Sequence, residues 1–157
     1  MLTPLMNYLD NENVKYTIII HSPAYEAEAI ANSVHMPAKE LAKTVIVKLD
    51  GILAMAVVPA SYRVDLPLLQ SVATARTAEL ASEEEFRGRF PDCETGAMPP
   101  FGNLYDMEVY VDERIARAEY IAFNATTHRH LIRMSWDDFN RLVKPRILRL
   151  SRVVYAA

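Results

Sequence analysis

Two apolar runs separated by Asp50-Gly51 form the most regular hydrophobic pattern in the chain. The first run, Thr44 to Val47, follows Lys43, and the second, Ile52 to Val58, begins directly after the glycine. Apolar and β-branched runs joined by Asp-Gly are typical of a β-hairpin, because glycine supplies the positive φ that a primed turn requires. The pattern predicts a hairpin with Lys43 at the mouth of its first strand. Since both strands are apolar almost throughout, they are expected to lie in a sheet covered on both faces.

Helical patterns occur on both sides of this hairpin. Thr3-Pro4 offers an N-cap hydroxyl and a proline at the first helical position. From Glu26 the apolar residues recur with the spacing of an amphipathic helix, which is expected to end before Pro37. Three further helices are predicted after residues that can cap a helix N-terminus, at Asp65, Ser82 and Ser135.

Short apolar segments predict the remaining strands. They lie at 16–20, 107–111, 119–123 and 130–134, while the segment 146–155 fits a strand or a helix equally well. Helices and strands interleave and a hairpin is present, so the sequence predicts a mixed α/β (α+β) fold whose sheet is mixed rather than purely parallel. At 157 residues the chain is expected to form a single domain, 1–157.

Composition and charge narrow the classes of function. The formal net charge of −3 argues against a broad electrostatic surface for nucleic acid, so DNA is not an expected partner and RNA would need a local basic patch. The single cysteine, Cys93, excludes an internal disulfide and a Cys-rich zinc site, and fits a reducing, cytoplasmic location. No signal peptide is recognisable, and no apolar run approaches the ~20 residues of a membrane span.

Most familiar catalytic signatures are absent, including the Gly-x-Ser-x-Gly elbow, the phosphate-binding glycine-rich loop and His-Glu-x-x-His. His128 and His130 could present two imidazoles on one face of a strand, but no third metal ligand is evident, so polar surface histidines are the alternative. Cys93 is flanked by two carboxylates that oppose thiolate formation, which makes it a poor nucleophile.

Two features stand out against this background, Lys43 and the loop from Gly96 to Gly102. Glycine lets a backbone come close to a ligand, and prolines fix the shape of that approach. A rigid loop that offers backbone N–H groups can bind a carbonyl oxygen or an oxyanion. The alternatives are a solvated lysine at a strand end and a tight crossing between two elements. The residues alone do not decide between these readings.

Five segments, in this order and spacing, carry a resemblance to a known family. They are His21-Ser-Pro-Ala-Tyr25, Ala42-Lys-Thr-Val-Ile-Val47, Val58-Pro59, Gly96-Ala-Met-Pro-Pro-Phe-Gly102 and Val109-Tyr-Val-Asp112. Together they resemble the YbaK/ProX (YbaK/EbsC) family of aminoacyl-tRNA deacylases, which includes the editing domain of prolyl-tRNA synthetase. The resemblance extends over roughly residues 15–145.

The resemblance implies a compact mixed α/β domain whose sheet is curled into a partly closed barrel. It implies hydrolysis of the ester that joins a wrong amino acid to the terminal adenosine of a tRNA. The expected partner is the acceptor end of a mischarged tRNA, with an aminoacyl-tRNA synthetase as a further candidate. Neither a cofactor nor a metal is expected.

The resemblance also implies roles for individual residues. Lys43 and Gly96 match the family's catalytic lysine and catalytic-loop glycine, and Asp112 is given a supporting role. Asn124-Ala125 departs from the small residue plus glycine of many relatives, which leaves the size and polarity of the pocket open. The residues predicted to contact substrate are His21, Tyr25, Thr44, Pro99, Phe101, Gly102, Asn124 and Ala125.

Two alternatives stay open beside a trans-editing deacylase. One is a non-catalytic module of the same fold that binds tRNA or a synthetase, and the other is a hydrolase of small-molecule esters. The presence of both Lys43 and Gly96 favours the deacylase, and predicts that these two residues face one pocket. The basic residues of the C-terminal run, Lys144, Arg146, Arg149 and Arg152, are either a tRNA contact or a solvated surface.

Overall fold

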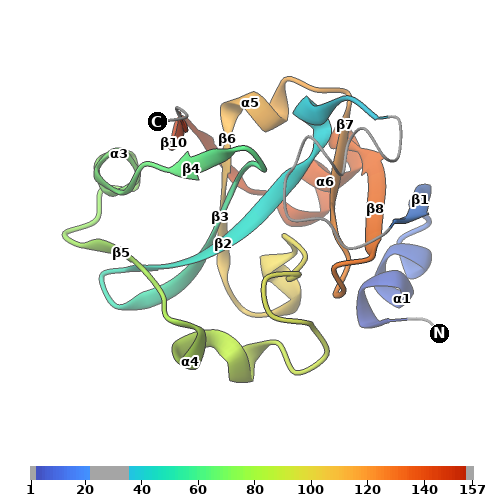
Figure 1. Ribbon diagram of the computed structural model, residues 1–157, viewed down its shortest axis with the longest axis horizontal. Coiled ribbons are helices and arrows are strands. Elements are labelled where there is room, and N and C mark those ends of the chain that lie inside the picture. Colours follow the sequence, from blue (N-terminus) through green and yellow to red (C-terminus); the bar gives the residue numbers. More distant parts are fainter. Residues whose placement is uncertain (1–2, 22–35, 155–157) are drawn as a thin grey trace.

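The computed structural model describes residues 3–21 and 36–154 (Figure 1). The helix predicted from Glu26 and the predicted contact residue Tyr25 lie outside the described residues. The described helices, 3-10 turns (η) and strands are, in chain order, α1 (Pro4–Asn11), β1 (Tyr16–Ile20), η1 (Ala38–Glu40), β2 (Ala42–Leu49), β3 (Ile52–Pro59), β4 (Tyr62–Val64), α3 (Leu66–Val72), β5 (Ala78–Leu80), α4 (Glu83–Phe86), η2 (Arg87–Arg89), η3 (Gly102–Leu104), β6 (Glu108–Asp112), α5 (Glu113–Ala116), β7 (Tyr120–Asn124), β8 (His130–Ser135), α6 (Trp136–Val143), β9 (Arg146–Leu148) and β10 (Ser151–Val153).

The described strands form three hydrogen-bonded sheets rather than one. The largest has the order β5-β2-β3-β6-β9, a second has the order β1-β8-β7, and β10 pairs with β4. In the largest sheet β3, β6 and β9 run parallel while the other pairs are antiparallel, which confirms the predicted mixed α/β fold. A parallel bridge between Leu41 and Ala122 joins the start of β2 to β7. This bridge connects the two larger sheets.

The predicted hairpin is confirmed. β2 and β3 pair along their whole length, from Ala42 opposite Pro59 to Leu49 opposite Ile52. Asp50 and Gly51 both have positive φ, 52° and 80°, as a type I′ turn requires. The Asp50 carboxylate also accepts two backbone N–H groups from the segment before β5, so the turn is held from outside the hairpin.

Both faces of the hairpin are covered, as the apolar runs predict. Successive side chains of a strand point to opposite faces. Ala42 and Ile46 of β2 therefore pack in the larger core, while Val47 lies in a smaller core with Leu69 of α3. The larger core contains the edge-to-face aromatic cluster of Phe101, Phe123 and Phe139.

The predicted helix starts are confirmed at Thr3, Asp65, Ser82 and Ser135, each of which caps a helix with its side chain. The ambiguous segment 146–155 forms two short strands, β9 and β10. Neither β4 nor β5 was expected, because strands of three residues are too short to show an alternating pattern.

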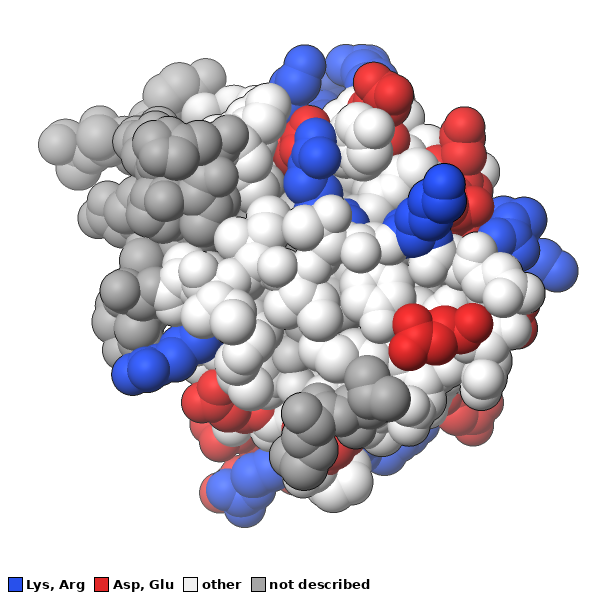
Figure 2. All heavy atoms as spheres, turned by 90° about the vertical axis from the view of Figure 1, so that its right-hand side faces the viewer, with Lys and Arg blue, Asp and Glu red and all other residues white. Residues whose placement is uncertain are grey.

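Figure 2 shows the face of the molecule on which α1, β1 and β8 lie. Uncharged residues fill most of its centre, and residues of both charges lie towards its margin. No broad basic surface is present among the described residues on this face, in line with the net charge. None of the helices in the described ranges has the length and apolar character that crossing a membrane requires.

Candidate active site

Lys43 lies near the start of β2, opposite Val58 of β3, and its side chain is half-buried. Burial, and to a smaller extent the neighbouring Arg63 guanidinium, lower the pKa of Lys43 below its ordinary value of 10.5. Within the described part of the chain no carboxylate forms an ion pair with Lys43. A partly desolvated cation with no ion pair inside the described ranges costs folding free energy, which makes Lys43 a candidate functional residue.

Asn124 is the β7 residue that we expect to lie nearest Lys43. Leu41 and Ala122 form a parallel bridge and pack in one small apolar cluster. Lys43 and Asn124 each follow two residues later, so their side chains project from the same face of adjacent strands. The Asn124 Oδ1 atom is buried, and no described residue donates a hydrogen bond to it. A buried acceptor of this kind is a candidate ligand contact.

Gly96 adopts a conformation that favours glycine. Its φ is 86°, and a Cβ atom there would lie 3.3 Å from Cε1 of His128. The Gly96 N–H donates to the Met98 thioether sulfur at 3.3 Å. Because thioether sulfur is a weak acceptor, this N–H is available to a better one.

The loop around Gly96 is fixed to the turn between β7 and β8. The Glu94 N–H donates to the Thr126 carbonyl at 2.7 Å, and the Thr126 N–H donates to the Ala97 carbonyl at 3.0 Å. His128 adds two contacts, since its Nε2–H donates to the Thr95 carbonyl at 2.7 Å and its N–H to the Glu94 carboxylate at 3.0 Å. The β7–β8 turn therefore contacts the Gly96 loop directly, and we expect it to reach Lys43 through Asn124 at its start.

Two more predicted contact residues lie at this turn. His21 is buried, and its backbone N–H donates to the Arg129 carbonyl at 2.9 Å. Ala125 is buried and closes the turn by donating its N–H to the His130 carbonyl. The anchoring role of His128 was missed, because the sequence separation from Gly96 hides a contact that only the fold creates.

Thr44 does not share the face of Lys43. It is the next residue along β2, so its side chain points to the opposite side, towards the larger core. The Thr44 hydroxyl is buried, and no hydrogen-bond partner for it occurs in the ranges that the structure describes. The predicted substrate contact of Thr44 thus stays a prediction, and it would require a ligand reaching between β2 and the larger core.

Packing accounts for the end of the glycine- and proline-containing loop. Phe101 is fully buried against Phe123 and Phe139, and Pro99 is buried as well. A Cβ atom on Gly102 would collide with the Met107 carbonyl oxygen. These contacts give Phe101 and Gly102 a packing role, and the substrate contacts of Pro99, Phe101 and Gly102 stay predictions.

Replacing Gly102 with alanine is therefore expected to destabilise the fold rather than to impair chemistry alone. The added methyl group must displace backbone, so the free energy of unfolding should fall by about 1–3 kcal/mol or more. Urea denaturation measures this loss. Gly88→Ala is the matched control, because no atom lies within 4 Å of a Cβ at that glycine. Equal stability of the two variants would contradict the packing explanation.

Asp112 acts as a structural link. Its buried carboxylate accepts the Ser151 hydroxyl at 2.7 Å, the Leu150 N–H at 3.1 Å and the Arg114 N–H at 2.9 Å. Burial alone would raise the pKa of Asp112, but these hydrogen bonds outweigh it and lower the pKa. The carboxylate thereby attaches the β10 segment to the end of β6, which is support for the fold.

The other candidate groups are less suited to catalysis. Burial raises the pKa of the Cys93 thiol to about 11, so the thiol is protonated near neutral pH. Within the described residues no cluster of three histidine, cysteine or acidic side chains is arranged to hold a metal ion. His130 instead hydrogen-bonds through Nδ1 to the Thr127 hydroxyl.

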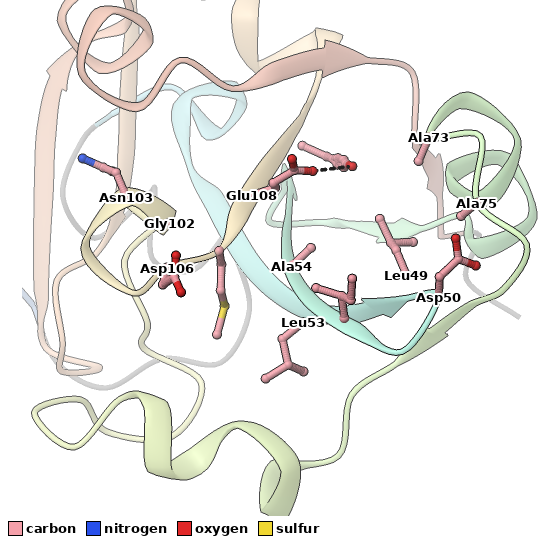
Figure 3. A pocket seen from close by; sticks show the side chains of 13 residues that line it. Leu49, Asp50, Leu53, Ala54, Ala73, Ala75, Gly102, Asn103, Asp106 and Glu108 are labelled. Carbon is pink, nitrogen blue, oxygen red and sulfur yellow. Dashed lines mark hydrogen bonds between the residues drawn. The ribbon is translucent and has the colours of Figure 1, made fainter.

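A cavity of about 520 Å³ opens elsewhere, between the tip of the hairpin and η3 (Figure 3). Leu49, Leu53 and Ala54 contribute apolar surface, while Asp106 and Glu108 contribute carboxylates. Its lining includes Gly102 but neither Lys43 nor Gly96. This cavity is therefore separate from the predicted catalytic residues.

Known proteins match the chain in sequence and in structure. The family model described as "Aminoacyl-tRNA editing domain" matches residues 21–142. Prolyl-tRNA editing protein ProX of Acetoanaerobium sticklandii is 24% identical over 153 residues, which cover 87% of this chain and 86% of ProX. A proline–tRNA ligase of Bacillus mycoides is 28% identical over 89 residues, covering 57% of this chain but only 16% of the ligase.

Solved structures match the fold. A protein described as a candidate trans-editing enzyme for prolyl tRNA synthetase superposes with a TM-score of 0.81 at 19% identity, covering 97% of this chain and 99% of that chain. At this identity the match concerns the fold alone. The family model, in contrast, covers well over half of the sequence and the segments that contain Lys43 and Gly96. The chain belongs to the aminoacyl-tRNA editing domain family.

Proposed function

We propose that this chain hydrolyses the ester of a mischarged tRNA in trans, with Lys43 and the loop at Gly96 as its catalytic elements. The class of activity, aminoacyl-tRNA deacylation, follows from the family. The match over 86% of ProX supports the trans-acting form. The assignment of residues is supported by the β7–β8 turn, which binds the Gly96 loop at Thr126 and His128 and whose first residue, Asn124, follows the bridge of Ala122 to Leu41.

Hydrolysis of an aminoacyl ester requires few catalytic groups from the protein. An aminoacyl ester is an activated carbonyl compound, so water can attack it without a covalent enzyme intermediate. The protein has to position the ester and stabilise the oxyanion that develops. The Gly96 N–H is suited to this role, because the carbonyl oxygen of a substrate is a stronger acceptor than the Met98 sulfur that it would replace.

Lys43 and Asn124 would bind the polar groups around the ester. The Lys43 ammonium has no carboxylate partner among the described residues, so it can pair with the tRNA end or with the developing oxyanion. The buried Asn124 Oδ1 can accept a hydrogen bond from the α-ammonium group of the amino acid. We assign the guidance of the attacking water to a ribose hydroxyl of the substrate.

The proposal includes partners and location. The acceptor end of a mischarged tRNA is the substrate, and an aminoacyl-tRNA synthetase that produces it is a further partner. The cytoplasm, where tRNA is charged, is the proposed location.

A deacylation assay over a panel of mischarged tRNAs tests the function. Release of one amino acid, or of a few small ones, at a rate well above spontaneous hydrolysis is the expected result. Discrimination by one methylene is worth only about 1–3 kcal/mol, so the panel should include close homologues. Hydrolysis of simple amino-acid esters without any tRNA dependence would instead favour a small-molecule esterase.

Activity is expected to fall at alkaline pH as Lys43 loses its proton. Because burial and Arg63 lower the pKa of Lys43, the loss should begin below the range of an ordinary lysine at 10.5. Arg63→Gln removes the smaller cause and should raise the pKa of Lys43. The alkaline limb of the pH–rate profile should then move to higher pH. Single-turnover rates, corrected for spontaneous ester hydrolysis at each pH, measure this shift. A limb that does not move in Arg63→Gln would show that another group controls it.

A further inference from the structure

Two arginines face each other across the β4–β10 ribbon. Arg152 of β10 pairs directly with Arg63 of β4 in the antiparallel register. Directly opposed side chains lie on the same face with Cβ atoms roughly 4.5–5.5 Å apart, and like charges in such a pair are destabilising. Both arginines are exposed, and within the described residues neither has an ion pair with a carboxylate. An anion is the ligand that would complete this arrangement.

A hollow of about 430 Å³ has Arg152, but not Arg63, in its lining. Three arginines line it, Arg114, Arg149 and Arg152, against one carboxylate, Asp65. Asp65 is already engaged in capping α3, since it accepts the Leu68 N–H at 3.1 Å. Because Arg114 is paired with the buried Asp112 carboxylate, Arg149 and Arg152 are left against Asp65, and the hollow keeps a net positive charge.

One of these guanidinium groups is held in place by the fold. Arg114 lies over the ring of Tyr62, 5.1 Å from its centre, and its Nη1 donates to the Asp112 carboxylate and to the Ser151 hydroxyl. Arg149 and Arg152 are exposed beside it. A planar guanidinium binds phosphate oxygens through two parallel hydrogen bonds, which makes a cluster of arginines suited to phosphodiesters.

The arginine pair is close to the proposed catalytic lysine. β4 follows β3 after a short turn, and β3 holds Val58 opposite Lys43. The positive charge of Arg63 also acts on Lys43, where it adds to the effect of burial in lowering the pKa. A polynucleotide whose 3′ ester lies at Lys43 would bring its preceding phosphates within reach of this ribbon.

We propose that Arg63, Arg152 and the adjoining hollow at Arg149 form a phosphodiester-binding site for the acceptor strand of tRNA. Naming tRNA as the source of the phosphodiester rests on the proposed function, whereas the opposed arginines do not depend on it. Since the chain has a net charge of −3, its electrostatic contact with RNA would then be local and involve few phosphates.

The salt dependence of RNA binding tests the site. The probe is a stem-loop RNA that carries no amino acid and has a single-stranded CCA end. The Kd of its complex with the protein is measured by fluorescence anisotropy at several KCl concentrations. Arg63→Gln/Arg152→Gln is expected to raise Kd about 10-fold or more at low salt. It should also flatten the plot of log Kd against log salt by about 1.4–1.8, which corresponds to two lost phosphate contacts.

Arg87→Gln is the matched control. It removes one positive charge, against two in the double variant, from an exposed residue of η2, which follows α4 at the opposite end of the molecule from β4 and β10 (Figure 1). This control should leave the salt slope unchanged. Because opposed like charges destabilise a ribbon, Arg152→Gln alone should keep or raise Tm, which separates lost binding from lost folding.

The outcomes distinguish the site from the catalytic proposal. If wild type deacylates tRNA and the double variant binds the RNA with unchanged Kd and slope, the arginine site is wrong and the deacylase stands. If the arginines control RNA binding but no tRNA of the panel is deacylated, the catalytic proposal fails and the site stands. If inorganic phosphate protects wild type but not the variant from thermal unfolding while RNA binding is unaffected, the site binds small anions and the RNA assignment is overturned. Absence of RNA binding by wild type overturns it as well.

Discussion

Lys43→Ala is expected to lower the rate of deacylation by at least about 10²-fold while the protein stays folded, because one group that stabilises transition-state charge is lost. Single-turnover hydrolysis of the preferred mischarged tRNA measures the effect. Lys48→Met on the same strand is the control. The Lys48 ammonium is paired with Glu79 and Glu85. The Lys48→Met substitution should therefore lower stability slightly and leave the rate of deacylation unchanged. Unchanged turnover by Lys43→Ala would remove this residue from the mechanism.

The charged Lys43 side chain should lower the free energy of unfolding of the protein. The pKa of Lys43 is lower in the folded chain than in the unfolded chain, so below that folded pKa the ammonium is disfavoured by folding. The cost is fully present below the folded pKa and is relieved as pH rises from the folded pKa to the unfolded pKa. Lys43→Met should therefore raise Tm at pH 7 while abolishing activity. A clear fall in Tm would indicate that Lys43 is a structural residue instead.

Gly96→Ala is expected to reduce deacylation by about 10²–10³-fold, as for the loss of one oxyanion donor. Two physical causes act together. An L-residue at a φ of 86° is strained, at a cost of about 1–3 kcal/mol, and the new Cβ would press on the His128 imidazole. Either cause displaces the N–H that we propose binds the carbonyl oxygen of the ester.

Two comparisons separate these causes. Gly51→Ala has a similar φ of 80° but no atom within 4 Å, so it should lose comparable stability and keep full activity. Adding His128→Ala to Gly96→Ala relieves the contact but not the backbone strain, and should restore only part of the rate. If Gly51→Ala lost activity as severely as Gly96→Ala, the rate would be reporting general destabilisation.

Much of the fold could be predicted because its signals are local. The hairpin depends on Asp50-Gly51 and two flanking apolar runs, and the helix starts depend on single capping side chains. β4 could not be predicted in this way, and the segment that contains β10 fits a strand or a helix equally well. Each of these two strands has three residues and is held by long-range pairing, which also creates the opposed arginines Arg63 and Arg152.

The candidate site likewise has features that local sequence predicts and features that depend on long-range pairing. Lys43 and Gly96 are predicted site residues because of local motifs and the resemblance to the family that these motifs carry. The place of the β7–β8 turn depends on pairings such as Leu41 with Ala122 and on the contact of His128 with Thr95, which no local pattern contains. The opposite facing of Lys43 and Thr44, in contrast, follows from the two-residue period of any strand and was available from the sequence.

The central claim is that the ester of the substrate binds between Lys43 and the Gly96 loop. Titration of ¹⁵N-labelled protein with a non-hydrolysable 3′-aminoacylamino-adenosine tests it directly by NMR. The Gly96 amide should shift strongly as its acceptor changes from sulfur to a carbonyl oxygen, together with the side-chain amide of Asn124. The claim would be contradicted if the Gly96 amide signal did not shift and the shifted signals came only from the cavity at Leu53, Asp106 and Glu108.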